Sequence, residues 1–155
     1  MKIEGIEFTQ KAAALILREN EDVYELLVHS FAENPLLPWR FPSGGIESET
    51  IEEGLLREVY EESGLQDLTI VRKLGVQRYY KAYSDRFIER HDYLLKTNID
   101  LPDTWQHLVH GNGNDAGEIF LYRWIRPKEI YRIDPEHHKF LDEKHLPEFF
   151  YAKSQ

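Results

Sequence analysis

The sequence contains no cysteine among its 155 residues. Disulfide bonds, thiolate zinc sites and cysteine nucleophiles are therefore excluded. Long apolar runs are missing as well, since no stretch approaches the roughly 18 residues from which a membrane-spanning helix is recognised. The first residues, Met1–Gly5, do not begin a signal peptide, because acidic residues interrupt any apolar run there. We therefore expect a cytoplasmic protein with no membrane partner.

Positive charge is scarce: 19 lysines and arginines stand against 28 aspartates and glutamates, a net charge of -9 at pH 7. This excess of acid argues against a nucleic acid duplex or an anionic membrane surface as partner. It leaves phosphorylated small molecules open, because a bound metal ion reverses the local field. Hydrophobic residues make up 41% of the chain, which is enough to build the core of a single domain over residues 1–155.

Much of the acid lies in residues 44–65, GGIESETIEEGLLREVYEESGL, where seven glutamates accompany one arginine. Glu58, Glu61 and Glu62 have the i, i+3, i+4 spacing that places side chains on one helix face, about 5–6 Å apart at Cβ. Like charges at this spacing repel one another. Oxygen-only ligands favour hard cations such as Mg2+ or Mn2+, so the spacing indicates a metal site.

The same segment resembles the signature of the Nudix hydrolase (MutT-like) family, G-x5-E-x7-R-E-U-x-E-E-x-G-U, where U is a bulky aliphatic residue. Residues 57–65 match every defined position of its second half, and Glu49 stands for the isolated glutamate. The first half is one residue short, because only four residues separate Gly44 from Glu49. Gly54 takes a helical position where the family often has alanine. Glycine at this position should lower the stability of the helix by about 1 kcal/mol relative to alanine, unless another backbone packs closely against it.

The resemblance implies a metal-dependent attack of water on a diphosphate, in which the cation neutralises phosphate oxygens and lowers the pKa of its bound water. The metal ligands it implies are three carboxylates and one backbone carbonyl: Glu58, Glu61, Glu62 and Gly44. Arg57 is expected to tie the helix to Glu49. Glu58 or Glu61 is the candidate general base. A further acid from outside the signature is expected at Glu118 or Asp115.

Candidate substrate contacts lie outside the signature. Trp39 and Arg40 belong to a segment, Trp39–Pro42, that resembles the strand leading into the signature. Tyr80 and Tyr83, in or beside a predicted turn, are candidates to stack on a nucleobase, although aromatic side chains more often belong to a core. Histidines offer zinc as an alternative metal, through His91, His107 and His110. Their spacing is not a defined zinc pattern, so we disfavour it.

Three functions are consistent with these residues. The first is a Mg2+-dependent hydrolase that cleaves a diphosphate linkage in a nucleoside di- or triphosphate, a nucleotide sugar or a related compound. The second is a dinucleoside polyphosphate hydrolase. The third is a non-catalytic nucleotide sensor of the same fold, although sensors usually lose signature glutamates that this chain keeps. Dimers are frequent in the family, so a homodimer is a further expectation.

Hydrophobic patterning predicts an α/β fold in which a mixed sheet lies between helices, and the resemblance implies the same α/β/α sandwich. The helix after Thr50 should end at Gly64 and bury Leu55, Leu56, Val59 and Tyr60. A C-terminal helix is predicted over 136–150, interrupted near Pro147, and residues 102–105 should be irregular. The predicted strands are 12–17, 23–31, 39–41, 68–82, 87–96 and 118–125, the last of them covered on both faces.

Overall fold

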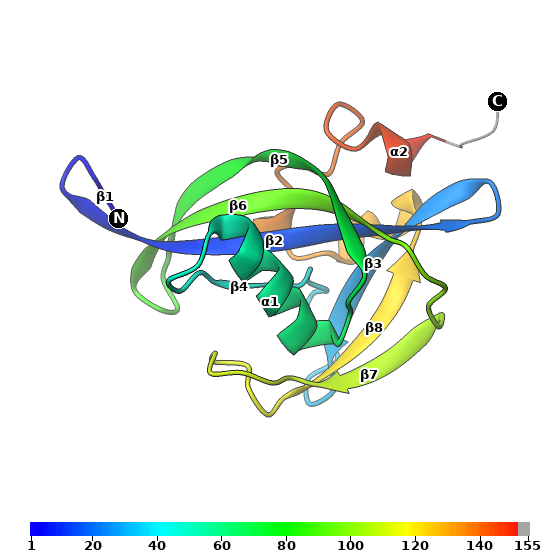
Figure 1. Ribbon diagram of the computed structural model, residues 1–155, viewed down its shortest axis with the longest axis horizontal. Coiled ribbons are helices and arrows are strands. Elements are labelled where there is room, and N and C mark those ends of the chain that lie inside the picture. The colour runs from blue at the N-terminus through cyan, green and yellow to red at the C-terminus, as the bar shows by residue number, and fades with distance from the viewer. Residues whose placement is uncertain (152–155) are drawn as a thin grey trace.

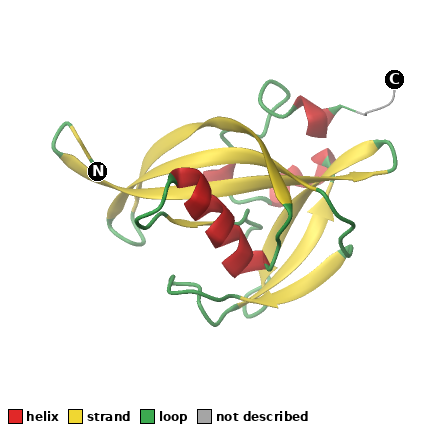
Figure 2. Cartoon of the chain, in the orientation of Figure 1, coloured by secondary structure: helices red, strands yellow, loops and turns green. Residues whose placement is uncertain are grey.

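The computed structural model describes residues 1–151 of the chain. Its sheet has eight strands, in the order β5-β6-β2-β3-β8-β7, with β1 and β4 also paired to β2 (Figures 1 and 2). Strands β2 and β6 are parallel and the other pairs are antiparallel, so the predicted mixed sheet is confirmed. The strands are β1 (Lys2–Ile3), β2 (Ile6–Asn20), β3 (Val23–Phe31), β4 (Ser43–Gly45), β5 (Leu68–Lys81), β6 (Arg86–Thr97), β7 (Thr104–Leu108) and β8 (Ile119–Ile125).

Two hydrophobic cores lie on opposite faces of this sheet, because successive residues of a strand point to opposite sides. Ala14 and Ile16 of β2 face helix α1 (Ile51–Ser63), whereas Leu15 and Leu17 face the C-terminal segment. That segment contains two 3-10 turns, Pro127–Arg132 and Pro135–His137, and the short helix α2 (Pro147–Phe150). The predicted α/β/α sandwich is therefore confirmed.

Local signals define both ends of α1. Thr50 forms a capping box with Glu53, in which its hydroxyl accepts from the Glu53 backbone N–H and the Glu53 side chain reaches back to the Thr50 backbone. Gly64 ends the helix at φ 79°, a left-handed conformation that glycine adopts without strain. Both ends are confirmed as predicted. The buried face of α1 is narrower than predicted, because Leu56 and Tyr60 are exposed.

Three predicted elements need correction. The C-terminal helix over 136–150 is wrong except for its interruption near Pro147: the segment consists of a 3-10 turn, loops and α2, which starts at Pro147 because proline has no backbone N–H with which to continue an earlier helix. Residues 102–105 are not all irregular, since β7 begins at Thr104 as an edge strand on β8. The strand over 39–41 is reduced to isolated bridges at Trp39 and Arg40, and the regular strand β4 follows it.

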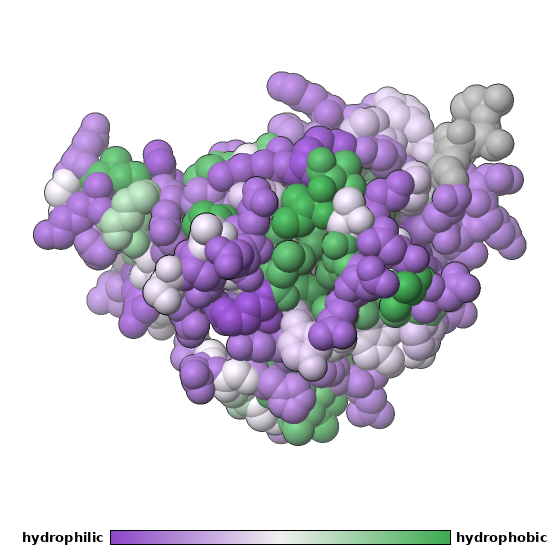
Figure 3. All heavy atoms as spheres, in the orientation of Figure 1, coloured by the Kyte–Doolittle hydropathy of each residue, from purple (hydrophilic) through white to green (hydrophobic). Residues whose placement is uncertain are grey.

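Strand β8 is covered less completely than predicted. Phe120, Tyr122 and Trp124 are buried, but Arg123 between them is exposed. In Figure 3 apolar side chains gather on the surface beside α1, while most of this face of the molecule is hydrophilic. Within residues 1–151, no helix is long and apolar enough to span a membrane.

The sheet opens between its two central strands. β2 and β3 pair only near their connecting turn, from Leu17 with Leu26 to Asn20 with Val23. Farther along, β2 pairs with β4 and β3 forms a bridge from His29 to Arg40. The chain from 39 to 45 therefore lies between the diverging strands, and this divergence creates the space for a site.

Candidate functional site

A cavity of about 510 Å3 occupies the space where β2 and β3 diverge. Its walls come from α1, β4, the loop of residues 109–118 and the turn between β5 and β6. The lining carboxylates are Glu58, Glu61, Glu62, Asp115 and Glu118, which we call the acidic half. The lining cations are Lys11, Arg40, Lys81 and Arg86, which we call the basic half. The cavity therefore presents charges of both signs to a ligand.

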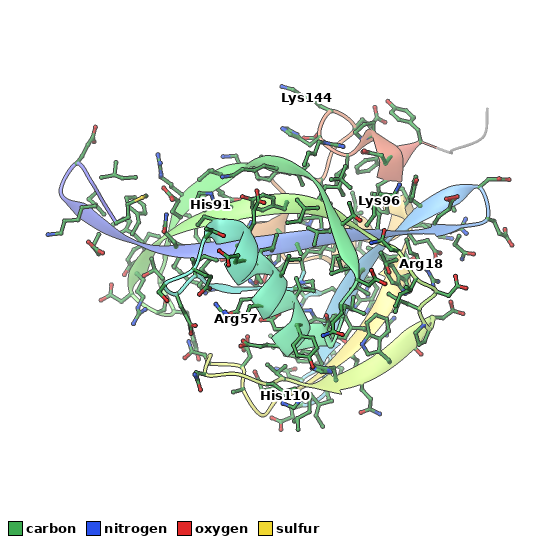
Figure 4. All side chains as sticks on the ribbon, in the orientation of Figure 1. Arg18, Arg57, His91, Lys96, His110 and Lys144 are labelled. Carbon is green, nitrogen blue, oxygen red and sulfur yellow. The ribbon has the colours of Figure 1, made fainter. Side chains whose placement is uncertain are left out.

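Arg57 connects α1 to the preceding loop. Its Nη2 donates to Glu49 Oε1 at 2.7 Å and to the Gly45 carbonyl at 2.9 Å, and its Nη1 donates to Glu58 Oε1 at 2.9 Å. Nη1 also lies 3.3 Å from Glu61 Oε2. The hydrogen bond from Arg57 is the main reason that the pKa of Glu49 lies below its usual range. In Figure 4, Arg57 extends from α1 on the side where the 109–118 loop lies. Arg57 thus fixes the loop and two carboxylates of the acidic half, those of Glu58 and Glu61.

The shortened loop packs against α1 at Gly54. A Cβ at this position would lie 2.6 Å from Ile46 Cδ1 and 2.7 Å from Glu49 Oε1, both closer than real Cβ contacts. The neighbours are side chains of the loop rather than another backbone. Glycine at position 54 leaves room for Ile46 and Glu49 of the loop, which explains why a glycine occupies the middle of this helix.

Two other glycines lie directly against the glutamates of α1. A Cβ on Gly44 would overlap the Glu58 carboxylate, and a Cβ on Gly111 would overlap that of Glu61. Gly111 also has φ 96°, a conformation that favours glycine. The Gly44 backbone and the 109–118 loop can therefore approach the carboxylates closely only because these positions lack side chains.

Glu62 is the most buried of the three α1 glutamates that line the cavity, with 6% of its surface exposed. Its Oε1 accepts a hydrogen bond from the Ser43 backbone N–H at 3.1 Å. Burial raises its pKa well above the usual range, and burial also raises the pKa of Glu58 despite its hydrogen bond with Arg57. A cation in the acidic half would compensate the cost of burying these charges.

Glu118 and Asp115 lie in the loop that faces α1 across the cavity. The pKa of Glu118 is raised, first by burial and then by its hydrogen bond with Asp115. The loop is held to α1 because the His110 N–H donates to the Glu61 carbonyl at 3.0 Å. Both candidates for the further acid therefore lie at the cavity, next to each other.

The donor set fits a hard divalent cation. It consists of carboxylates and the nearby Gly44 backbone, and it includes no thiolate or thioether. Within the described residues, no three histidine or acidic side chains are already arranged as a metal cluster. Glu58 and Glu61 are hydrogen-bonded to Arg57 instead, and Glu62 to Ser43. A cation would thus compete with Arg57 for the carboxylates of Glu58 and Glu61.

The structure brings only some of the predicted substrate contacts to the cavity. Arg40 and Tyr83 line it, and Tyr83 is 95% exposed. Trp39 does not, because it is buried in the core between the guanidinium groups of Arg123 and Arg132, at 4.9 and 4.2 Å from its ring centroid. Tyr80 also lies outside the lining.

Tyr80 donates a hydrogen bond to Asp85 and has half of its surface exposed.

The three histidines considered for zinc do not lie together. His107 Nε2 contacts the Glu61 carbonyl at 3.0 Å, with the His110 ring 5.4 Å from its own. His91 lies on β6 against Glu89.

Sequence reasoning missed most of the basic half and the buried His29. Lys11 directly precedes the buried apolar run Ala12–Leu17 of β2, at the point where the sequence predicts that the strand begins. A lysine at the end of a strand is common, so this position gives little signal of a site. His29 carries no signal either, since it looks like any residue of a buried strand. It lines the cavity with its ring stacked on Phe120 at 4.1 Å.

A family model described as NUDIX domain matches residues 8–144. No curated protein sequence matches the chain significantly. Among solved structures, a Nudix hydrolase from Nitrosomonas europaea is 18% identical with a TM-score of 0.63, over 96% of this chain and 100% of that one.

Two further structures are similar to this chain. An Ap4A hydrolase from C. elegans is 20% identical with a TM-score of 0.60, over 84% of this chain and 89% of that one. The dihydroneopterin triphosphate pyrophosphohydrolase of E. coli is 14% identical with a TM-score of 0.63, over 88% and 95%. At these identities, the structural similarity speaks for the fold alone.

Proposed function

The chain belongs to the Nudix family, and from this premise we propose that it hydrolyses a diphosphate linkage in a nucleotide or nucleotide derivative with the help of Mg2+ or Mn2+. One observation carries the proposal. The five carboxylates of the acidic half line a cavity whose other half is cationic. An anionic diphosphate can enter such a cavity only where cations, from the protein or from solution, neutralise it.

The residues of the chain have separate roles in this proposal. Glu58, Glu61 and Glu62, with the Gly44 carbonyl, would hold the cation. When bound, the cation supplies charge neutralisation at the phosphate oxygens and a lower pKa for water. Glu58 or Glu61 accepts the proton of the attacking water. Arg57 holds the loop against α1 through its hydrogen bond to Glu49.

Glu118 is the acid we propose from the facing loop, with Asp115 as the alternative. Its carboxylate shares a hydrogen bond with Asp115 at the cavity. Glu118→Gln should lower the turnover number measurably while thermal stability stays unchanged. If Glu118→Gln turns over as fast as wild type while Asp115→Asn does not, the role belongs to Asp115.

A dinucleoside polyphosphate hydrolase is the second candidate. It is favoured by Tyr83, which is exposed at the cavity, and by the cationic residues opposite the acidic half. The sequence feature that favours the sensor is the loop between Gly44 and Glu49, which is one residue short. Gly54 leaves room for Ile46 and Glu49 of that loop, which supports catalysis.

The test is phosphate and pyrophosphate release from a panel of nucleoside di- and triphosphates, nucleotide sugars and dinucleoside polyphosphates, each with Mg2+ and with EDTA. Turnover of one class that stops in EDTA is the expected result. Nucleotide binding detected by thermal shift, without turnover of any member, would contradict hydrolysis and leave the sensor.

A further inference from the structure

The basic half of the cavity contains cations that the protein itself does not neutralise. Arg40 lies 2.7 Å from Asp134, and Lys81 lies 3.3 Å from Glu136, so these two are paired. Lys11 and Arg86 have no ion pair or side-chain hydrogen bond within residues 1–151. Four cations therefore share the two carboxylates on this side of the cavity.

Lys11 is held in an unfavourable setting. Its side chain is only partly exposed, and burial, followed by the nearby charges of Lys81 and Arg40, lowers its pKa. Partial burial of an unpaired ammonium group costs free energy, and binding of an anion beside it would offset that cost. Glu136 and Asp115 offset this effect only in part, so the chain keeps a cluster of cations that its own carboxylates do not fully neutralise.

The basic half adjoins the acidic half directly. In the pairing of β2 with β4, Lys11 is opposite Gly45 and Ala12 is opposite Gly44. Opposed residues in antiparallel strands lie about 4.5–5.5 Å apart at Cα, so the backbone of Lys11 lies beside β4, which also borders the acidic half. Arg86 follows the turn between β5 and β6, which Figure 1 draws to the left of α1.

Polar side chains complete this half of the cavity. Thr9 on β2 and Tyr83 and Ser84 in the β5–β6 turn line it with hydroxyl groups. His29 also lines the cavity, with 2% of its surface exposed and with Nδ1 lacking any hydrogen-bond partner in the described part of the chain.

We propose that the basic half binds a second anionic group of the substrate, so that the substrate is a diphosphate that carries at least one further phosphate. Lys11 and Arg86 bind this further phosphate, while the acidic half acts on the linkage that is cleaved. The inference rests on the proposed function for the identity of that linkage. It excludes nucleotide sugars with a neutral sugar as the preferred class.

The first test measures binding and does not depend on hydrolysis. Inorganic tripolyphosphate is titrated into the full chain in EDTA at low ionic strength, where exposed charges are least screened. Lys11→Met/Arg86→Gln should bind about tenfold more weakly than wild type. The control Lys128→Met/Lys144→Met makes the same change in net charge at exposed lysines, one of which Figure 4 shows far from Arg57, and should bind as wild type does.

The second test measures specificity with two substrates that differ only in phosphate number, diadenosine diphosphate and diadenosine tetraphosphate. The double variant should raise KM for the tetraphosphate and leave KM for the diphosphate unchanged. An equal rise for both would assign the cations to the cleaved linkage and overturn the proposal. So would tripolyphosphate binding that is absent in wild type or unchanged in the double variant. Lys11→Arg, which keeps the charge, should retain binding, and the double variant should keep the circular dichroism spectrum of wild type, so that its weaker binding follows from lost charge and not from lost folding. If neither compound is hydrolysed but tripolyphosphate binds as expected, the proposed activity fails and the anion site stands.

Discussion

Gly44 and Gly45 are adjacent in β4, yet only one of them has room for a side chain. A Cβ on Gly44 would overlap the Glu58 carboxylate, whereas a Cβ on Gly45 would meet nothing within 4 Å. Neither residue has a positive φ, so alanine fits the backbone at both positions. The two residues therefore separate the effect of crowding the acidic half from that of changing the loop.

Gly44→Ala should lower the turnover number by about a hundredfold, the scale on which a misplaced catalytic group acts. The physical reason is displacement of the Glu58 carboxylate. Thermal stability should change little, because Glu58 is only partly buried and can rotate away. Gly45→Ala is the matched control and should stay near the wild-type rate. Equal rates for the two variants in a steady-state assay would remove Glu58 from the chemistry.

At the scale of the element, α1 is positioned by its C-terminal end. The last carbonyls of a helix have no partner within it, and here other elements provide the donors. The Tyr122 hydroxyl donates to the Glu62 carbonyl at 2.8 Å, and Trp105 Nε1 donates to the Ser63 carbonyl at 3.1 Å. Strands β7 and β8 therefore hold the end of α1 that carries the glutamates.

Tyr122→Phe removes one of these donors and leaves a buried carbonyl without a partner. The free energy of unfolding should fall by about 1–3 kcal/mol, the cost of an unsatisfied buried group, as measured by urea denaturation. Tyr131, which is 77% exposed, gives the matched control: Tyr131→Phe should change stability by less than about 0.5 kcal/mol. A Tyr122→Phe protein as stable as wild type would mean that β8 does not anchor α1.

The same element shows which features a sequence can predict. The caps of α1 were predicted because Thr50, Glu53 and Gly64 act on neighbouring backbone. In the C-terminal segment only the interruption near Pro147 was predicted, because the apolar residues before it suggested a helix where the chain forms a 3-10 turn and loops. Lys11 and Arg86 line the same cavity. This could not be predicted from either stretch alone, since it depends on how β2 and the β5–β6 turn are placed around the cavity.

At the scale of the whole molecule, two buried histidines make stability depend on pH. His29 and His137 each have 2% of their surface exposed, and neither His137 nitrogen has a partner within the described residues. Burial, followed by the charge of Arg40, lowers the pKa of His29 from 6.5 to about 3, and the same two causes lower that of His137 well below 6.5. Both histidines are therefore neutral in the folded protein.

The sign of the effect follows from proton binding. Below pH 6.5 the unfolded chain binds protons on these histidines and the folded chain does not, so stability falls as the pH falls; for His29 the loss continues to about pH 3. Each histidine contributes a slope of up to about 1.4 kcal/mol per pH unit.

His137→Leu should therefore reduce the loss of melting temperature between pH 7.5 and pH 5. It should not destabilise the protein at pH 7.5, because no hydrogen bond is lost. Thermal denaturation at both pH values provides the measurement, with wild type at pH 7.5 as the reference. An undiminished loss between the two pH values in His137→Leu would show that His137 is not buried as a neutral group.

The central claim is that the α1 glutamates perform metal-dependent hydrolysis of a diphosphate. It is tested most directly by the turnover number of Glu61→Gln, on the best substrate of the nucleotide panel with saturating Mg2+. Glu52→Gln is the control, because Glu52 lies on the same helix but is exposed and does not line the cavity. We predict a loss of at least about a hundredfold in Glu61→Gln, with the fold intact by circular dichroism, and none in Glu52→Gln. A wild-type turnover number in Glu61→Gln would contradict the account.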